Sequence, residues 1–153
     1  MKLHSYLLDE NLENILNHIK SFSTSSLTRE FAYSKGVEYF NKGMFFESHE
    51  ILEYQWKKEN GNIKIFFQII IQIAISLHKI HVRPNSTGAY SLASKAGGKI
   101  DFLLKENLTA EYKDILKLIN DFIISVKQSD EKNLKNIPIP KLIEKLNFSL
   151  LEN

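Results

Sequence analysis

The chain has no cysteine among its 153 residues, and this absence excludes several kinds of chemistry. Without thiols it has no disulfide bridges, no thiolate metal site and no cysteine nucleophile. A composition without cysteine fits the reducing cytoplasm, and the first residues contain no apolar stretch long enough for a signal peptide. We therefore expect a cytoplasmic protein.

Arginine is almost as scarce, since Arg29 and Arg83 are the only arginines among 20 basic residues. Arginine is the side chain best suited to forked contacts with phosphate and guanine, so its scarcity argues against nucleic-acid recognition. The formal net charge of +2 is also too small to indicate such a partner. We expect no nucleic-acid partner.

The sequence also lacks an uninterrupted apolar run long enough to cross a membrane. Its most apolar segment, residues 63–80, contains Lys64, Lys79 and several other polar residues. A membrane span needs about 20 mostly apolar residues with few charges. This segment therefore predicts a buried core helix, and we expect no membrane partner.

Apolar residues that recur every three or four positions are the main pattern of this chain, and they are typical of amphipathic helices. Together with glycine and proline breaks, the pattern predicts helices over residues 3–19, 28–42, 44–58, 62–82, 86–104, 109–127 and 140–147. The short connections favour antiparallel hairpins. We predict an all-α single domain over residues 1–153, a compact bundle of about six to seven helices. A tetratricopeptide-like packing of the hairpins is compatible with this pattern.

Two adjacent glycines, Gly97 and Gly98, interrupt good helix formers within the predicted helix 86–104. Each glycine costs roughly 1 kcal/mol relative to alanine inside a helix. Close approach of a neighbouring helix would explain why the chain tolerates this cost, and a local kink in the helix is the alternative.

The predicted helix 44–58 carries polar side chains on its apolar side. At about 100° per residue, that side contains Phe45, Phe46, His49, Leu52, Glu53 and Trp56, with Glu50 on its border. Burying an unpaired imidazole or carboxylate is costly, so His49 and Glu53 need partners. The following helix offers Gln68, Gln72 and His78. We therefore predict a polar pocket between these two helices.

One interpretation of this pocket is a catalytic metal site. Zinc and similar divalent ions accept imidazole nitrogen and carboxylate oxygen, and a catalytic site needs about three protein ligands. His49, Glu53 and His78 would be the ligands, and Glu50 would act as general base for a bound water. The pattern resembles H-E-x-x-H, although position 53 is Glu where that motif has a second His.

Another interpretation is a non-catalytic, tetratricopeptide-like protein-interaction module. In it the cluster is only a structural network, in which His49 pairs with Glu53 or a glutamine and fixes the register of the two helices. Paired histidines and acids in helical cores are commoner than metal sites, so the residues alone favour this network. A small-ligand pocket without catalysis is the third interpretation. A homodimer is compatible with so small an apolar chain, but no interface is indicated.

The run FNKGMFFESHEILEYQW at residues 40–56 is similar to a signature that reads approximately F-N-x-G-x-[FY]-[FY]-E-A-H-E-x-L-E-x-x-W. That signature is typical of the bacterial and archaeal family catalogued as domain of unknown function 309. A second similar block lies within residues 67–92, and the resemblance covers about residues 28–104. Predicted helices 3–19 and 109–147 would pack on this family-like core.

The resemblance implies an all-helical fold with the Glu-x-His-Glu-x-x-Glu face turned inward. Members are often labelled as metal-dependent hydrolases, a label that rests on the same kinds of His and Glu residues. The matched polar positions here are Glu47, His49, Glu50, Glu53, Gln68 and Gln72. The pocket would be lined by Glu47, Trp56, Gln68 and Gln72.

Overall fold

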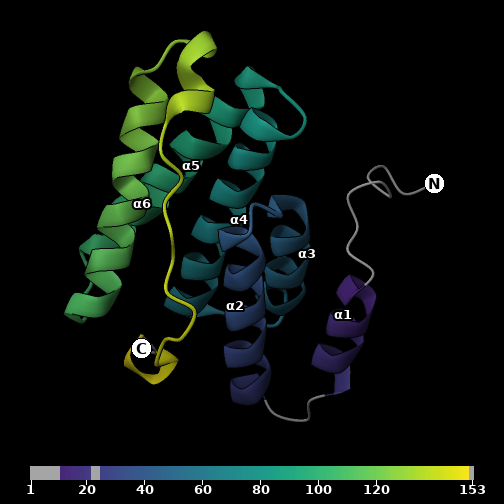
Figure 1. Cartoon of the computed structure of the whole chain (residues 1–153). Coiled ribbons are helices and arrows are strands. Elements are labelled where there is room, and N and C mark those ends of the chain that lie inside the picture. Colours follow the sequence, from purple (N-terminus) through teal and green to yellow (C-terminus); the bar gives the residue numbers. More distant parts are fainter. Residues whose placement is uncertain (1–10, 22–24, 152–153) are drawn as a thin grey trace.

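The computed structural model describes residues 11–21 and 25–151, which contain six α-helices, two 3₁₀ helices and no strand (Figure 1). The elements are α1 (Asn11–Ser21), α2 (Ser25–Asn41), α3 (Phe45–Trp56), α4 (Gly61–His81), α5 (Ser86–Leu104), α6 (Ala110–Gln128), η2 (Glu131–Asn136) and η3 (Phe148–Leu150). The predicted all-α bundle is confirmed. Residues 3–10 of the first predicted helix lie outside the described residues.

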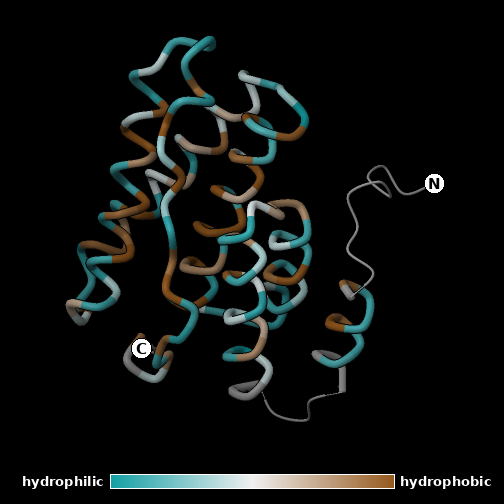
Figure 2. Tube along the Cα trace, viewed as in Figure 1, coloured by the Kyte–Doolittle hydropathy of each residue, from teal (hydrophilic) through white to brown (hydrophobic). Residues whose placement is uncertain are grey.

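The helices α2 to α6 pack against one another in chain order, and α1 lies against α2 and α3. In α6 the buried residues recur at three and four positions, as the sequence pattern predicts: Tyr112, Ile115, Leu116, Ile119, Phe122, Ile123 and Val126. Figure 2 shows this alternation of hydrophobic and hydrophilic residues along α6. One apolar face therefore holds α6 on the bundle.

The central helix is α4, which packs against both α3 and α5. By length and composition it is the one described helix that is able to cross a membrane, but 67% of its most apolar window is buried inside the protein. Such burial is what a core helix of a soluble bundle shows. The prediction that residues 63–80 form a core helix is confirmed.

The end of α2 follows the sequence signal. Gly43 has a φ of +80°, in the left-handed region that favours glycine, and its N–H donates to the carbonyl of Phe40 at 3.0 Å. Asn85 caps α5, because its side chain accepts a hydrogen bond from the N–H of Gly88.

The prediction of a short helix over residues 140–147 is wrong. These residues are extended between η2 and η3, and we call residues 137–151 the C-terminal tail. Figure 1 shows the tail running along the bundle beside α2 and α6. Pro138 and Pro140 have no N–H to donate to a helical ladder, and side chains of the bundle bind the peptide groups that follow them.

Gly36, on α2, permits close helix approach. A Cβ atom at this position would lie 2.5 Å from Cγ of Leu52, so α3 fits against α2 only because the side chain is absent. Ser48 strengthens this contact, since its hydroxyl donates to the Gly36 carbonyl at 2.6 Å. Close approach does not explain Gly98, where a Cβ would meet nothing within 4 Å, and α5 is one continuous helix there.

We predict opposite effects for alanine at two of these glycines. Gly36→Ala should lower the free energy of unfolding by about 1–3 kcal/mol, because the new methyl group collides with Leu52. Gly98→Ala should raise it by about 0.4–1 kcal/mol, because alanine restricts the unfolded chain and has free space in the helix. Urea unfolding followed by circular dichroism measures both, and a stabilising Gly36→Ala would contradict the close approach of α2 and α3.

Candidate functional site

His49 and Glu53, the centre of the predicted site, lie in contact on α3. His49 Nε2 is 3.2 Å from Glu53 Oε2, and His49 Nδ1 is 3.3 Å from the carbonyl oxygen of Phe46. The side chain of His49 is 16% exposed, and that of Glu53 is 38% exposed. The pair therefore lies at the edge of the bundle, where water reaches Glu53, and not in the dry interior that the helix pattern predicts.

The third predicted metal ligand, His78, is buried on α4 and contacts an aromatic ring. The ring of Phe46 lies 5.6 Å from the ring of His78 and 5.1 Å from the ring of His49. Among residues 11–21 and 25–151, no three His, Asp or Glu side chains are arranged to hold a metal ion. The geometry thus joins His49 to Glu53 but does not assemble the three-ligand set.

The other predicted pocket residues are divided between the core and its edge. Glu47 is buried, whereas Glu50, Trp56, Gln68 and Gln72 are half-buried. Neither glutamine hydrogen-bonds to the His49–Glu53 pair within the described chain. These residues share one helix hairpin, in which the two glutamines lie apart from the His49–Glu53 pair.

Trp56 has a structural contact of its own. The ammonium nitrogen of Lys64 lies 4.6 Å from the centre of the Trp56 ring, which also packs against the core. A cation above an aromatic ring stabilises such a pair. Trp56 therefore helps to join the end of α3 to the first turn of α4.

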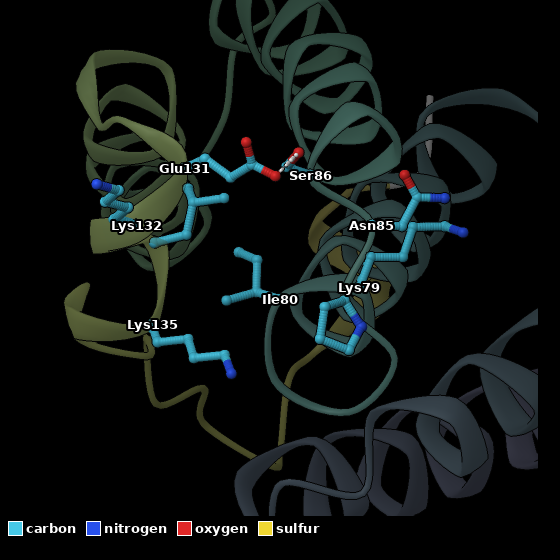
Figure 3. A pocket seen from close by; sticks show the side chains of 9 residues that line it. Lys79, Ile80, Asn85, Ser86, Glu131, Lys132 and Lys135 are labelled. Carbon is cyan, nitrogen blue, oxygen red and sulfur yellow. Dashed lines mark hydrogen bonds between the residues drawn. The ribbon is translucent and has the colours of Figure 1, made fainter.

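A cavity of about 660 Å³ lies between the end of α4, the start of α5 and η2 (Figure 3). Its lining includes three lysines, but their amines do not converge: Lys132 points away, and the amine of Lys79 lies beside Asn85. The hydroxyl of Ser86 donates to the carboxylate of Glu131 at 2.8 Å across the rim. This contact ties η2 to α5, and the cavity shows no built anion site.

The contacts that sequence reasoning missed hold the C-terminal tail to the bundle. The amide nitrogen of the Asn41 side chain donates to the Leu142 carbonyl at 2.8 Å, and its oxygen accepts from the Leu142 N–H at 3.0 Å. The Tyr33 hydroxyl donates to the Ile143 carbonyl at 2.8 Å. The Tyr112 hydroxyl donates to the carbonyl of Asn147 at 2.9 Å. All four bonds reach the backbone of the tail.

Apolar side chains complete the attachment of the tail. Its buried members are Pro140, Leu142, Leu146, Phe148 and Leu151, whereas Ile139 and Ile143 are exposed. Phe148 lies among four rings of the bundle, which belong to Tyr33, Phe66, Phe67 and Tyr112. We call these four aromatic residues together with Asn41 the tail-binding face.

The first part of the tail is packed more loosely. A cavity of about 270 Å³ is lined by residues 137–141 on one side and by Leu118, Phe122 and other α6 residues on the other. Pro140 is buried in this part, but the hydrogen bonds from the bundle to the tail begin at Leu142, where Asn41 binds the backbone.

A buried ion pair, also missed, fixes the start of α2. The guanidinium of Arg29 donates to both carboxylate oxygens of Glu59, at 2.9 and 2.8 Å. Gln55 donates to the same carboxylate at 2.6 Å. Removing one partner of a buried pair is costly, so this fork is a structural link between α2 and the turn before α4. The four-residue spacing of Gln55 and Glu59 was its only local signal.

The fold and these contacts define an all-α domain that holds an extended segment against its surface through backbone hydrogen bonds. Residues 33–92 match the family model described as "Domain of unknown function (DUF309)". The matched stretch contains the second half of α2, all of α3 and α4, and the start of α5. No curated protein and no solved structure matches the chain.

We predict a small effect of removing the imidazole of His49. Since Glu53 is open to water, His49→Ala should lower the free energy of unfolding by less than about 1 kcal/mol. Urea unfolding measures this, with Lys42→Ala as the matched control, because Lys42 forms an exposed pair four residues from Glu38. A loss several times larger would place His49 in a buried network.

We also predict that the folded state becomes less stable at alkaline pH, because of the two tyrosines that bind the tail. Burial, and then the nearby Glu111 carboxylate, raises the pKa of Tyr112 above its ordinary value of 10.0, and burial raises the pKa of Tyr33 still further. The folded protein then keeps phenol protons that the unfolded chain loses. The contribution of these phenols to the free energy of unfolding should be fully present below pH 10. Above pH 10 it should fall by about 1.4 kcal/mol per pH unit for each tyrosine.

Urea unfolding midpoints between pH 8 and pH 11 test this expectation. The double variant Tyr33→Phe with Tyr112→Phe should be less stable at neutral pH but should lose less stability above pH 10 than the wild type. Tyr54→Phe, outside the tail-binding face, is the control. An equal alkaline loss in the double variant would contradict the role of these phenols.

Proposed function

We propose that this protein is a non-catalytic interaction module that binds an extended polypeptide segment on the face covered by its own tail. The observation that carries this proposal is the pair of hydrogen bonds between Asn41 and Leu142. Because both bonds are made to the backbone, they suit any residue except proline at that position. Extended peptides are commonly bound in this way, with backbone bonds for affinity and apolar side chains for specificity.

The way the tail is attached supports its replacement by another segment. Its first residues border a cavity, and its firm contacts lie between residues 142 and 151. The chain just before the tail is held independently, since Tyr90 donates to the Ser129 carbonyl and Ser86 donates to Glu131. The tail is therefore able to leave without releasing η2 from α5.

The position of the family segment supports the same function. Tyr33 and Asn41 lie within residues 33–92, whereas the tail lies outside them. Two of the hydrogen-bond donors of the tail-binding face thus lie in the family-matched segment, whereas the tail that they bind lies outside it. In this proposal the chain's own tail covers the face when no partner is bound. The partner is a protein segment whose apolar side chains have a spacing similar to that of the tail.

A metal-dependent hydrolase is a second candidate, and the geometry favours it less. It would use His49, Glu53 and His78 as ligands and Glu50 as base, but no three-ligand group is arranged within the described chain. In the proposed module, the His49–Glu53 pair only stabilises α3.

We predict that the full-length chain with Phe148→Ala binds a fluorescent peptide of residues 137–151 added in solution. This substitution weakens the attachment of the chain's own tail by removing one of its two most enclosed side chains, so the tail competes less with the added peptide. Fluorescence anisotropy should show saturable binding, tighter than to the wild-type chain. Adding Asn41→Ala should weaken binding about tenfold, because two backbone bonds are lost.

Asn107→Ala, at an exposed loop asparagine, is the matched control and should leave binding unchanged. Circular dichroism checks that the Phe148→Ala chain is folded, and Leu151→Ala weakens the tail more mildly if it is not. Absence of saturable binding to a folded chain would overturn the proposal. A wild-type dimer that Phe148→Ala dissociates would place a second copy's tail on this face and contradict the intramolecular arrangement.

A further inference from the structure

The tail-binding face encloses one aromatic side chain of the tail, Phe148, with four aromatic rings around it. The centre of the Phe148 ring lies 5.2 Å from that of Tyr33, 5.7 Å from that of Phe67, 6.2 Å from that of Phe66 and 6.4 Å from that of Tyr112. Phe148 is 2% exposed, as is Leu151. The enclosure therefore surrounds the ring rather than touching one side of it.

The angles between these rings favour an aromatic occupant over an aliphatic one. Phe148 meets Tyr33 at 76° and Phe66 at 67°, both edge-to-face. In this arrangement the positive edge of one ring contacts the negative face of another, which adds about 0.5–1.5 kcal/mol per pair beyond the burial of apolar area. A leucine is somewhat smaller than phenylalanine and makes no such contact.

Hydrogen bonds on both sides of the segment fix where this ring must lie. Asn41 holds the backbone of Leu142, and Tyr112 holds the carbonyl of Asn147, the residue directly before Phe148. Tyr112 and Tyr33 each bind the tail backbone and also line the enclosure. The spacing between the residue held by Asn41 and the enclosed ring is therefore set by the bundle.

We infer that the tail-binding face selects protein segments that carry an aromatic residue six positions after the residue held by Asn41. This inference rests on the proposed function and adds the chemistry of the partner. The segment is extended, has an apolar side chain at the held position, and places its ring among the four aromatic residues of the face. The residue directly after the held one is free to vary, because Ile143 is exposed in the tail.

Competition with the labelled peptide of residues 137–151, on the full-length Phe148→Ala chain, tests this inference. A Phe148→Leu peptide should bind about tenfold more weakly than the natural peptide, and a Phe148→Ala peptide about a hundredfold more weakly. Inserting one glycine between Glu144 and Lys145 should weaken binding by at least tenfold, because it moves the ring out of register. An Ile143→Ser peptide is the matched control and should bind like the natural one.

Two results separate this inference from the proposed function. Equal affinity of the natural and Phe148→Leu peptides would overturn aromatic selection while leaving segment binding intact. Full affinity of the glycine-insertion peptide would overturn the fixed spacing. Phe66→Leu in the chain removes one of the two edge-to-face partners, and it should reduce the preference for Phe148 over Phe148→Leu without abolishing binding of either peptide.

Discussion

An extended segment that lies against helices has no neighbouring strand, so side chains must bind its peptide groups. Asn41 meets this constraint for both polar groups of Leu142, and the two buried tyrosines do so for carbonyls further along the tail. These donors stand on α2 and α6, which do not follow each other in the bundle. The packing of the helices between them therefore decides where a segment is bound and how far apart its fixed points lie.

Most of the helices follow directly from the sequence, but the tail does not. In α6 and α4 the local pattern of apolar residues is the same pattern that packing requires. In the tail, Leu142 and Leu146 are four residues apart and follow Pro140, which imitates the first turns of a helix. What keeps the tail extended is Asn41, 101 positions away in the sequence. A contact over that distance leaves no periodic signal.

The candidate site was predictable only in part for a related reason. The four-residue spacing of His49 and Glu53 correctly places them in contact, because that spacing is a property of the helix itself. Burial depends on the neighbouring helices, and α3 is turned so that water reaches Glu53. The ring of Phe46 contacts both His49 and His78, and the pattern of polar residues did not predict these contacts. The geometry of a single helix determines which of its side chains are in contact. The packing of neighbouring helices determines whether such a pair also contacts a residue of another helix.

Binding and stability are coupled in this arrangement because the same side chains serve both. Tyr33 and Tyr112 are fully enclosed members of the hydrophobic core, and their hydroxyls are also donors to the tail. If the tail leaves, these hydroxyls lose their partners and the rings around Phe148 meet water, so the empty state is disfavoured. A partner segment therefore has to bury a comparable ring and satisfy the same donors. A partner segment therefore replaces the tail on the face, and the face is not left empty in between. Any segment that binds the face also stabilises the bundle.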